Sequence, residues 1–424
     1  MAADTQKWDT SYEWKATTLL GLGFGLVGLD RWIIAPLLPS MAADLGLSVQ
    51  QAGNLIGALG LVWGVFAIVS GRLSDKIGHR KILIPAILLF SLMSGFSGMA
   101  VGFTSLLGIR AMMGLMEGSY CPTSFAATAA AAHPSRRGFL QGLQQSGFAL
   151  FGFGLGPIIA TQLLLYVPSW RWVFWAVAIP GIIVGLLLMV VLREPKDTQG
   201  GKLMASAVGP HGGGGTAGWS QVLNKNIVLC MLALFCAMSC IFVLGGLLPT
   251  YLTDAPVMGK SLSPQAIGGI ASALGFGGFI GQFGIPGISD FLGRRLTAVI
   301  AFLGAAITLW FFMGLGPNPT ALFGMLFLVS FFALGNVALI TGPISTESAP
   351  VGLMSSAIGL VVGAGEIFGG GVAPSLAGFV GQNYGIQNIL WMPLIGVALG
   401  VVVAAFLTET APSKVGHHVA AAAH

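Results

Sequence analysis

Charged side chains are scarce in this sequence. Only 8% of its 424 residues are Asp, Glu, Lys or Arg, whereas 55% are hydrophobic. A soluble domain carries about a quarter charged residues, so the composition excludes an ordinary soluble protein and predicts an integral membrane protein. The apolar runs are long and continuous rather than short and alternating, which favours membrane-spanning helices over a β-barrel.

Cysteine is also rare, with four residues in the chain. Cys236 and Cys240 lie one helical turn apart, but no histidine or further cysteine is placed to complete a metal site. We therefore expect packing roles for them, no metal and no other cofactor. The polar first sixteen residues precede a full-length span, so we expect no cleavable signal peptide. The net charge of +5 sits mostly in loops and does not indicate a nucleic-acid partner.

No nucleophile–base pair, metal set or nucleotide-binding loop stands out in the sequence, so we do not expect an enzyme. Apolar runs of about 20 residues predict twelve membrane spans, six on each side of a polar gap. The predicted fold is all-α, with two pseudo-symmetric six-helix bundles. We place the bundles at 1–192 and 226–412, joined by a cytoplasmic linker at 193–225 that contains the run Gly212–Gly215. The tail, 413–424, partly resembles vector-encoded sequence.

The Lys and Arg residues of the loops predict the orientation. With a cytoplasmic N-terminus, fifteen of them lie inside and only Arg171 and Lys260 lie outside. Because cytoplasmic loops carry the excess of positive charge, both termini are predicted to be cytoplasmic.

The two halves repeat short sequence patterns. Residues 74–78 and 289–293 both read Ser-Asp-x-x-Gly before basic residues, and residues 152–157 resemble residues 369–374. Internal duplication of this kind is typical of secondary transporters, whose substrate site lies near the midplane between the repeats.

Two opposite charges, Asp30 and Arg31, interrupt the first apolar run, 16–39. A charge at the bilayer centre costs about 2.5–3.5 kcal/mol, so an intramembrane ion pair is by default a functional hypothesis. The alternative is that the two charges only neutralise each other and fix the helix. Arg31 keeps its proton and offers a planar fork that fits a carboxylate, so we predict that it anchors an anionic substrate.

Further charges at membrane depth suggest proton coupling. Arg110 and Glu117 are two turns, about 10.5 Å, apart on one helix face, which places Glu117 near the depth of Arg31. Desolvation favours the protonated form of Asp30 and Glu117, whereas a nearby arginine favours the ionised form, so both can load and release protons. Glu366 is either another coupling carboxylate or a packing residue.

Several uncharged side chains are candidate substrate contacts. Gln144 and Gln145 point about 100° apart, so one of them is expected to line the cavity. Tyr120 follows Glu117 by one turn, and Asn336 is a buried amide that contacts either substrate or a neighbouring helix. The aromatic residues Phe148 and Trp32 are expected to face lipid or the protein core.

The segment from Gly71 to Lys81, Gly-Arg-Leu-Ser-Asp-Lys-Ile-Gly-His-Arg-Lys, resembles the loop signature of the major facilitator superfamily. In that family the loop holds the two halves together in the outward-facing state. The resemblance therefore implies gating roles, and the repeat extends them to the second half; the residues are Gly71, Asp75, Gly78, Arg80, Asp290 and Arg294.

The fourth span indicates which branch of the superfamily the chain resembles. Arg110 resembles the fourth-helix arginine that the superfamily associates with proton coupling. The segment Glu117-Gly118-x3-Pro122, together with the Asp-Arg pair of the first span, is similar to the anion:cation symporter branch. That branch moves organic anions with protons or sodium.

We therefore predict a monomeric secondary transporter in the cell membrane, with the bacterial inner membrane expected. It would import a small organic anion (a sugar acid or an aliphatic or aromatic acid) by proton symport with alternating access. The sparse polar candidates favour a poorly hydroxylated carboxylate. Sodium coupling, a drug/proton antiporter that exports its substrate, and a non-transporting receptor on the same fold are the alternatives. The expected partners are the substrate and the lipid bilayer.

Overall fold

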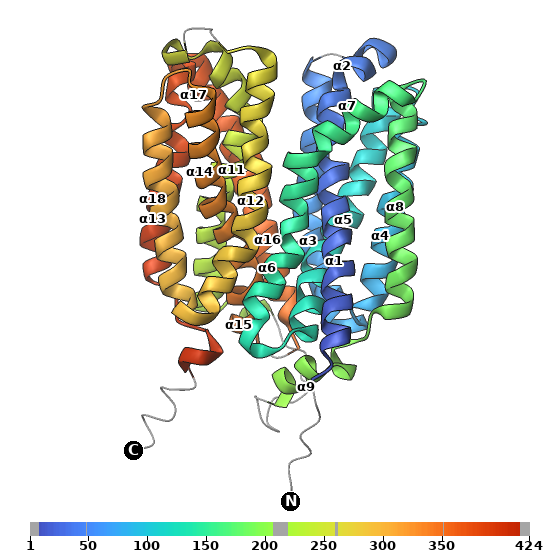
Figure 1. Cartoon of the computed structure of the whole chain (residues 1–424). Coiled ribbons are helices and arrows are strands. Elements are labelled where there is room, and N and C mark those ends of the chain that lie inside the picture. The colour runs from blue at the N-terminus through green and yellow to red at the C-terminus, as the bar shows by residue number, and fades with distance from the viewer. Residues whose placement is uncertain (1–7, 48, 207–218, 259–261, 351, 416–424) are drawn as a thin grey trace, which may run out of the picture.

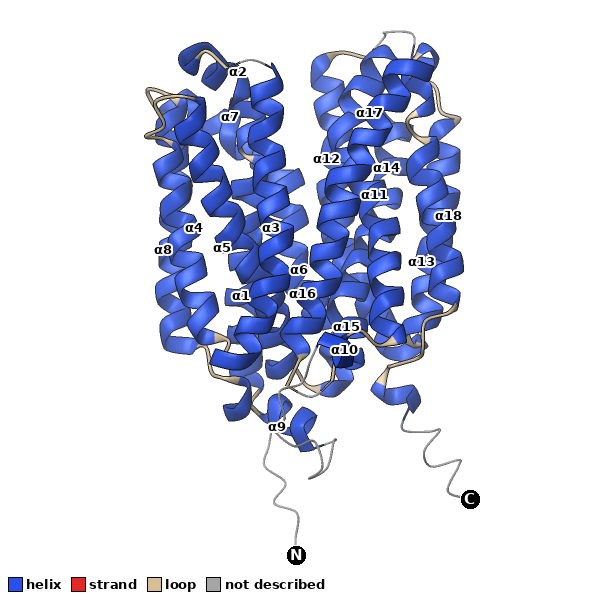
Figure 2. Cartoon of the chain, turned by 180° about the vertical axis from the view of Figure 1, so that it is seen from behind, coloured by secondary structure: helices blue, strands red, loops and turns tan. Residues whose placement is uncertain are grey.

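Two bundles of helices stand side by side in the computed structural model of the chain (Figure 1 and Figure 2). The structure describes residues 8–47, 49–206, 219–258, 262–350 and 352–415, and every regular element in these ranges is helical. The predicted glycine run of the linker lies outside the described residues. The first helix begins and the last ends at the same end of the molecule, which we call the termini face; the opposite end is the far face (Figure 1).

The N-terminal bundle is built from helices that run between the two faces. Their bounds are α1 (Thr10–Trp32), α3 (Val49–Ile77), α4 (Arg80–Ser97), α5 (Phe103–Ala131), α6 (Arg137–Phe148) with its continuations η2 (Ala149–Leu155) and α7 (Gly156–Tyr166), and α8 (Trp170–Val191). The short α2 (Ile34–Leu45) follows α1 at the far face. Between the bundles lie η3 (Pro195–Asp197), α9 (Gln199–Ser206) and α10 (Trp219–Val222).

The C-terminal bundle repeats this arrangement. Its helices are α11 (Lys225–Asp254), α12 (Pro264–Leu292), α13 (Arg294–Met313), α14 (Pro319–Leu339) with η5 (Ile340–Ile344) and α15 (Ser345–Ser348), α16 (Met354–Ala364) with η6 (Gly365–Val372) and α17 (Ala373–Tyr384), and α18 (Trp391–Ala405). Eleven helical stretches in the described part of the chain are long and apolar enough to cross a membrane. With α5, a 29-residue helix packed among them, the predicted twelve-helix fold is confirmed.

Each bundle has its own apolar core. Leu20, Phe90 and Leu106 belong to the core of the N-terminal half, whereas Phe302 and Leu326 belong to that of the C-terminal half. Most apolar side chains are therefore buried within their own half, and only a few, such as Ile358 and Val362 of α16, join the core of the other half.

Glycines let the two halves approach at backbone distance. A Cβ atom on Gly71 of α3 would lie 2.3 Å from the carbonyl oxygen of Ser355 on α16. A Cβ atom on Gly275 of α12 would lie 2.2 Å from the backbone nitrogen of Gly154 in η2. Small residues at helix contacts are the usual means of close packing within a membrane. Larger residues at these positions would force the halves apart.

Among the described residues, three helices widen into π-helical turns, and each of these turns lies beside a proline. η2 is followed by Pro157, η5 contains Pro343, and η6 is followed by Pro374. Proline has no N–H to donate to the carbonyl four residues earlier and its ring crowds that carbonyl, so the helix must adjust locally. The repeated Gly-rich, Pro-ended motifs of the two halves thus mark η2 and η6. All three turns lie beside the same cavity between the halves.

Candidate substrate-binding site between the halves

Arg31 and Glu366 form an ion pair across the interface. Arg31 lies near the end of α1, and its Nη1 and Nη2 donate to Glu366 Oε1 and Oε2 on η6 at 3.2 and 2.9 Å. Their side chains are only 8% and 4% exposed. Two parallel N–H···O bonds are the geometry in which a guanidinium holds a carboxylate most specifically.

Aromatic rings from both halves flank the Arg31 guanidinium. Its Cζ lies 5.7 Å from the ring centre of Trp63 on α3 and 5.1 Å from that of Phe242 on α11. Cation–π contacts of this kind contribute about 0.5–2 kcal/mol, depending on desolvation. The rings therefore hold the cation in place while its edge remains available to a carboxylate.

Asp30 and Arg31 point to different neighbours, as consecutive helical residues do. Asp30 Oδ1 accepts a 2.7 Å hydrogen bond from Ser94 of α4, and its backbone oxygen accepts one of 3.1 Å from Arg110 Nη1. Arg31 instead reaches the other half. This arrangement contradicts the alternative that the two charges only neutralise each other, and it gives Glu366 a basic partner from another span.

Glu117 lies at the same level, buried and without a hydrogen-bond partner among the described residues. Arg110 Nε and Nη2 also have no such partner there. Glu117 interacts electrostatically with Asp30, Arg31 and Arg110. A carboxyl group buried in this way is stable only when it carries a proton or is bound by water or ligand.

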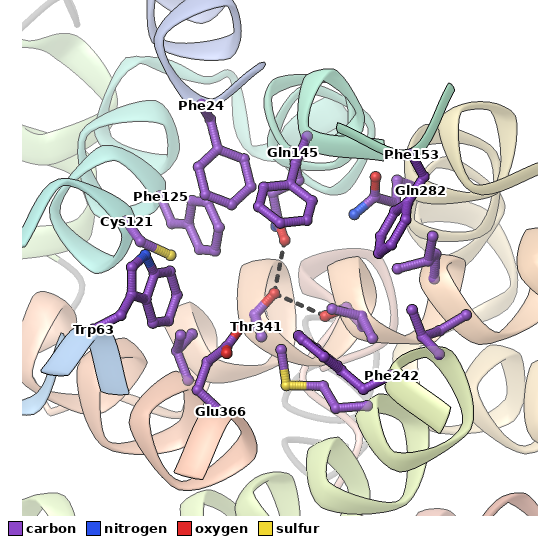
Figure 3. A pocket seen from close by; sticks show the side chains of 16 residues that line it. Phe24, Trp63, Cys121, Phe125, Gln145, Phe153, Phe242, Gln282, Thr341 and Glu366 are labelled. Carbon is purple, nitrogen blue, oxygen red and sulfur yellow. Dashed lines mark hydrogen bonds between the residues drawn. The ribbon is translucent and has the colours of Figure 1, made fainter. Parts of the chain in front are cut away.

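A cavity of about 50 Å³ lies between the halves beside Glu366 (Figure 3). Six aromatic residues line it: Phe24, Trp63, Phe125, Phe148, Phe153 and Phe242. The polar lining consists of Gln145, Gln282, Thr341 and Glu366. Phe148 thus lines the cavity as well as packing against the apolar core of the N-terminal half, where we expected it.

The structure distinguishes the two neighbouring glutamines of α6. Gln145 lines the cavity, where its Oε1 lies 2.7 Å from the Thr341 hydroxyl and its Nε2 donates to the Ala338 carbonyl at 3.3 Å. Gln144 points into the N-terminal bundle and donates to Ser124 Oγ at 3.2 Å. The helical rotation of 100° between consecutive residues separates the two environments.

Two other predicted substrate contacts lie away from the cavity. The Tyr120 hydroxyl, fully buried, donates to the Leu20 carbonyl at 3.1 Å inside the N-terminal bundle. Asn336 Nδ2 donates to the Ala298 carbonyl at 3.2 Å and ties α14 to α13. Direct substrate contact by Tyr120, Gln144 or Asn336 does not fit this arrangement, because each side chain is committed to a helix–helix contact within one bundle.

Sequence reasoning missed Trp63, Phe242 and Gln282 as site residues. Nothing in the local sequence separates these residues from the other aromatic and polar residues of their helices. The signal that was available is the repeated Gly-rich, Pro-ended motif, because it marks the π-helical turns that carry Phe153 and Glu366.

The predicted gating aspartates both contact a helix N-terminus of the opposite half at the termini face. Asp75 accepts from the backbone nitrogens of Ser355 and Ser356 on α16 at 3.0 and 2.7 Å. Asp290 accepts from those of Gly138 and Phe139 on α6 at 3.1 and 3.0 Å. A carboxylate is stabilised at such a position by the N–H groups and the helix dipole. The internal repeat thus appears in space as two equivalent contacts between the halves.

The side-chain hydrogen bonds of Arg294 and Arg80 stay within one half, whereas Gly71 packs against Ser355 of the opposite half. Arg294 pairs with Asp290 at 2.7 Å and with Glu347 at 2.9 Å, and so orients Asp290 towards α6. Arg80 donates to the carbonyls of Met189 and Leu192 at the end of α8, within its own bundle. Gly78 has a φ of +101°, which a residue with a side chain rarely adopts.

Two six-helix halves around a central cavity, joined by matched contacts at one face, define a membrane carrier rather than an enzyme. The Major Facilitator Superfamily model matches residues 20–361 and 253–423, so the chain belongs to the major facilitator superfamily of membrane transporters. The chain is 28% identical to the "Probable 4-methylmuconolactone transporter" of Cupriavidus pinatubonensis, over 92% of this chain and 89% of the relative. It is 27% identical to the sialic acid transporter NanX of Escherichia coli, over 92% and 91%.

A solved structure of the proton:xylose symporter XylE, bound to 6-bromo-6-deoxy-D-glucose, has the same fold. The TM-score is 0.78 at 19% identity, and the match covers 95% of this chain and 97% of that one.

Proposed function

We propose that this protein imports a small organic carboxylate together with a proton. The observation that carries the proposal is the Arg31–Glu366 pair, in which Arg31 of the N-terminal half is held by a carboxylate of the opposite half that lines the central cavity. The printed names of the two relatives, transporters of 4-methylmuconolactone and of sialic acid, support an organic-acid substrate.

The pair provides a direct means of coupling. While Glu366 is ionised it occupies the guanidinium, and a substrate carboxylate has no counter-ion. A proton on Glu366 removes that charge, and the substrate carboxylate then pairs with Arg31 in its place. The loaded site is neutral, so the halves can close over it and reopen on the other side. Loss of the proton restores the Arg31–Glu366 pair, which displaces the substrate. One proton and one carboxylate cross together.

Asp30, Arg110 and Glu117 are proposed to carry the proton between the far face and Glu366. Arg110 contacts Asp30, and Glu117 lies within electrostatic range of both arginines and of Glu366. A buried carboxyl group without a fixed partner can accept and release a proton without breaking a hydrogen bond. These features support a relay in the N-terminal half that ends at the pair.

We further propose that the termini face is cytoplasmic, as the Lys and Arg of the loops predict. The Asp75 and Asp290 contacts then close the cytoplasmic side, and substrate enters from outside. In this proposal residues 1–192 and 226–412 move as units about the linker at 193–225, and the protein works as a monomer in the bacterial inner membrane. The buried arginine anchor argues against a drug exporter.

The proposal is tested with protein reconstituted in liposomes. Because one proton and one monocarboxylate would cross without net charge, uptake is followed with labelled substrate and with a pH-sensitive dye inside the liposomes. Monocarboxylates, sugar acids and aromatic acids are compared under an imposed proton gradient and, separately, a sodium gradient. We expect uptake that requires the proton gradient and that Arg31→Ala abolishes. The matched control is Arg171→Ala, whose partner Asp44 lies in the same half at the far face. Uptake that survives in Arg31→Ala, or that follows sodium instead, would contradict the proposal.

A further inference from the structure

The walls of the central cavity are mainly apolar, and six of the sixteen lining residues are aromatic. Trp63 and Phe125 come from the N-terminal half and Phe242 from the C-terminal half, and these rings surround the space next to Glu366 (Figure 3). Aromatic side chains favour flat, apolar ligands, because ring–ring contacts add to the burial of surface. A ligand covered with hydroxyl groups would lose its hydration against these walls without replacement hydrogen bonds.

Most polar groups of the cavity are already engaged with protein. Gln145 and Thr341 hydrogen-bond each other, and Gln145 also donates to the Ala338 carbonyl. Glu366 is held by Arg31. The cavity therefore has few free donors and acceptors for a sugar acid, which carries a hydroxyl on nearly every carbon.

Gln282 of α12 is the exception. Its side chain is 2% exposed, lines the cavity, and its Oε1 has no hydrogen-bond partner among the described residues. Figure 3 shows Gln282 on the opposite side of the cavity from Glu366. The amide can accept through its oxygen or donate through its nitrogen. One unsatisfied polar group thus faces the carboxylate-binding end across an aromatic space.

The size of the cavity fits a small ring once the ion pair opens. Its volume of about 50 Å³ is below that of a cavity of about 150 Å³ that holds benzene. Entry of a ring therefore requires side chains to move, and Arg31 and Glu366 are the side chains that the substrate carboxylate must separate. Ligand entry and opening of the pair become one event.

We propose that the substrate is a flat carboxylic acid with a single ring and one hydrogen-bonding substituent opposite the carboxylate, and that Gln282 recognises that substituent. This inference rests on the proposed function, because it places the carboxylate on Arg31. It adds the chemical class of the substrate and a residue that determines specificity.

The test compares four probes by isothermal titration with the purified protein. They are benzoate, 4-hydroxybenzoate, cyclohexanecarboxylate and D-gluconate. We expect 4-hydroxybenzoate to bind about tenfold tighter than benzoate, because a lost partner for a buried polar group costs about that factor. We expect benzoate to bind several-fold tighter than cyclohexanecarboxylate, which has similar size but is not flat, and gluconate to bind weakest.

Variants of Gln282 then test whether this residue recognises the hydroxyl group of 4-hydroxybenzoate. Gln282→Leu, and the closer match in volume Gln282→Met, are expected to bind benzoate as well as before and to lose the preference for the hydroxyl group. Gln144→Leu, the same substitution outside the cavity, is the control and is expected to keep the preference for the hydroxyl group. A hydroxyl preference that persists in both Gln282 variants would overturn the assignment.

The outcomes separate this inference from the proposed function. Gluconate binding that is tighter than that of every ring acid and is lost in Arg31→Ala would overturn the substrate class and leave the proposed function intact. Binding of benzoate with unchanged affinity in Arg31→Ala would overturn the proposed function and the placement of the carboxylate with it. Absence of binding by all three ring acids at millimolar concentration would overturn the inference.

Discussion

Arg31 and Glu366 lie 335 positions apart in the sequence and share two hydrogen bonds at the boundary of the two halves. Each is more than nine-tenths buried, and neither has its counter-ion within its own helix. The pair thus joins the halves at the level of the cavity, whereas Asp75 and Asp290 join them at the termini face. Opening the carrier must break contacts at both levels.

Removal of one member of this pair is expected to destabilise the protein more than removal of both. Arg31→Met or Glu366→Gln alone leaves an unpaired group in an apolar site, and breaking a buried pair in this way costs about 3–5 kcal/mol. The double variant leaves no buried charge at this position and should recover most of that loss. Unfolding temperatures of the four proteins in detergent measure the coupling. Losses that simply add would show that the two side chains do not stabilise each other.

Glu117→Gln is expected to reduce proton-coupled uptake without lowering the stability of the protein. Neither carboxyl oxygen of Glu117 has a partner among the described residues, so the isosteric amide loses no hydrogen bond and the unfolding temperature should stay the same or rise. Uptake driven by a proton gradient should fall at least tenfold, while exchange of internal for external substrate continues. Glu13→Gln is the control: Glu13 pairs with Arg136 near the termini face, so it should lower stability and leave coupling intact. A Glu117→Gln protein that remains fully dependent on the gradient would exclude a coupling role.

The sequence was sufficient to predict the architecture, because it rests on local features. Twenty-residue apolar runs fix the helices, and the repeated loops 74–78 and 289–293 indicate two related halves. The charged residues at membrane depth could be found in the sequence for the same reason, because each interrupts a run of apolar residues. Asp30, Arg31, Arg110 and Glu117 do lie together in the structure.

Partners and orientations could not be predicted in the same way, because they depend on how distant helices pack. Glu366 is the partner of Arg31, and no local pattern connects η6 with the end of α1. Gln145 rather than Gln144 lines the cavity, a distinction that needs the rotation of α6 about its axis. The positions of Tyr120 and of the aromatic lining residues could not be predicted either, because the sequence does not distinguish a ring buried in a core from one that lines a cavity.

Loss of the two aspartate contacts should open the termini face. Asp75→Asn and Asp290→Asn each replace a carboxylate that accepts two backbone N–H bonds with a neutral amide. A hydrogen bond to a charged group contributes about 1.5–3 kcal/mol, so each substitution weakens the contact between the halves. Each variant should shift the population towards the state open at the termini face, and the double variant should shift it further. Spin-label distances between the tips of the two halves at that face measure the shift. Asp44→Asn, at the far face, is the control. Unchanged distances in the double variant would argue against a gating role.

His79 should make the closed termini face sensitive to acid. It lies between α3 and α4, where its Nε2 is 3.1 Å from the Ser355 hydroxyl of the opposite half and Glu194 contacts only its backbone nitrogen. Burial lowers the pKa of His79 from 6.5 to about 4. The closed state therefore binds fewer protons than a state that exposes His79, and the stability that results is complete above pH 6.5 and is lost as pH falls towards 4.

At pH 5 this loss amounts to about 2 kcal/mol, because one pKa unit corresponds to about 1.4 kcal/mol. Lys76, Lys81 and Arg137 line the same face. The spin-label distances at the termini face should therefore lengthen between pH 7 and pH 5 in the wild-type protein and change much less in His79→Gln, which cannot titrate. Identical pH profiles for the two proteins would exclude His79 as the source of the acid sensitivity.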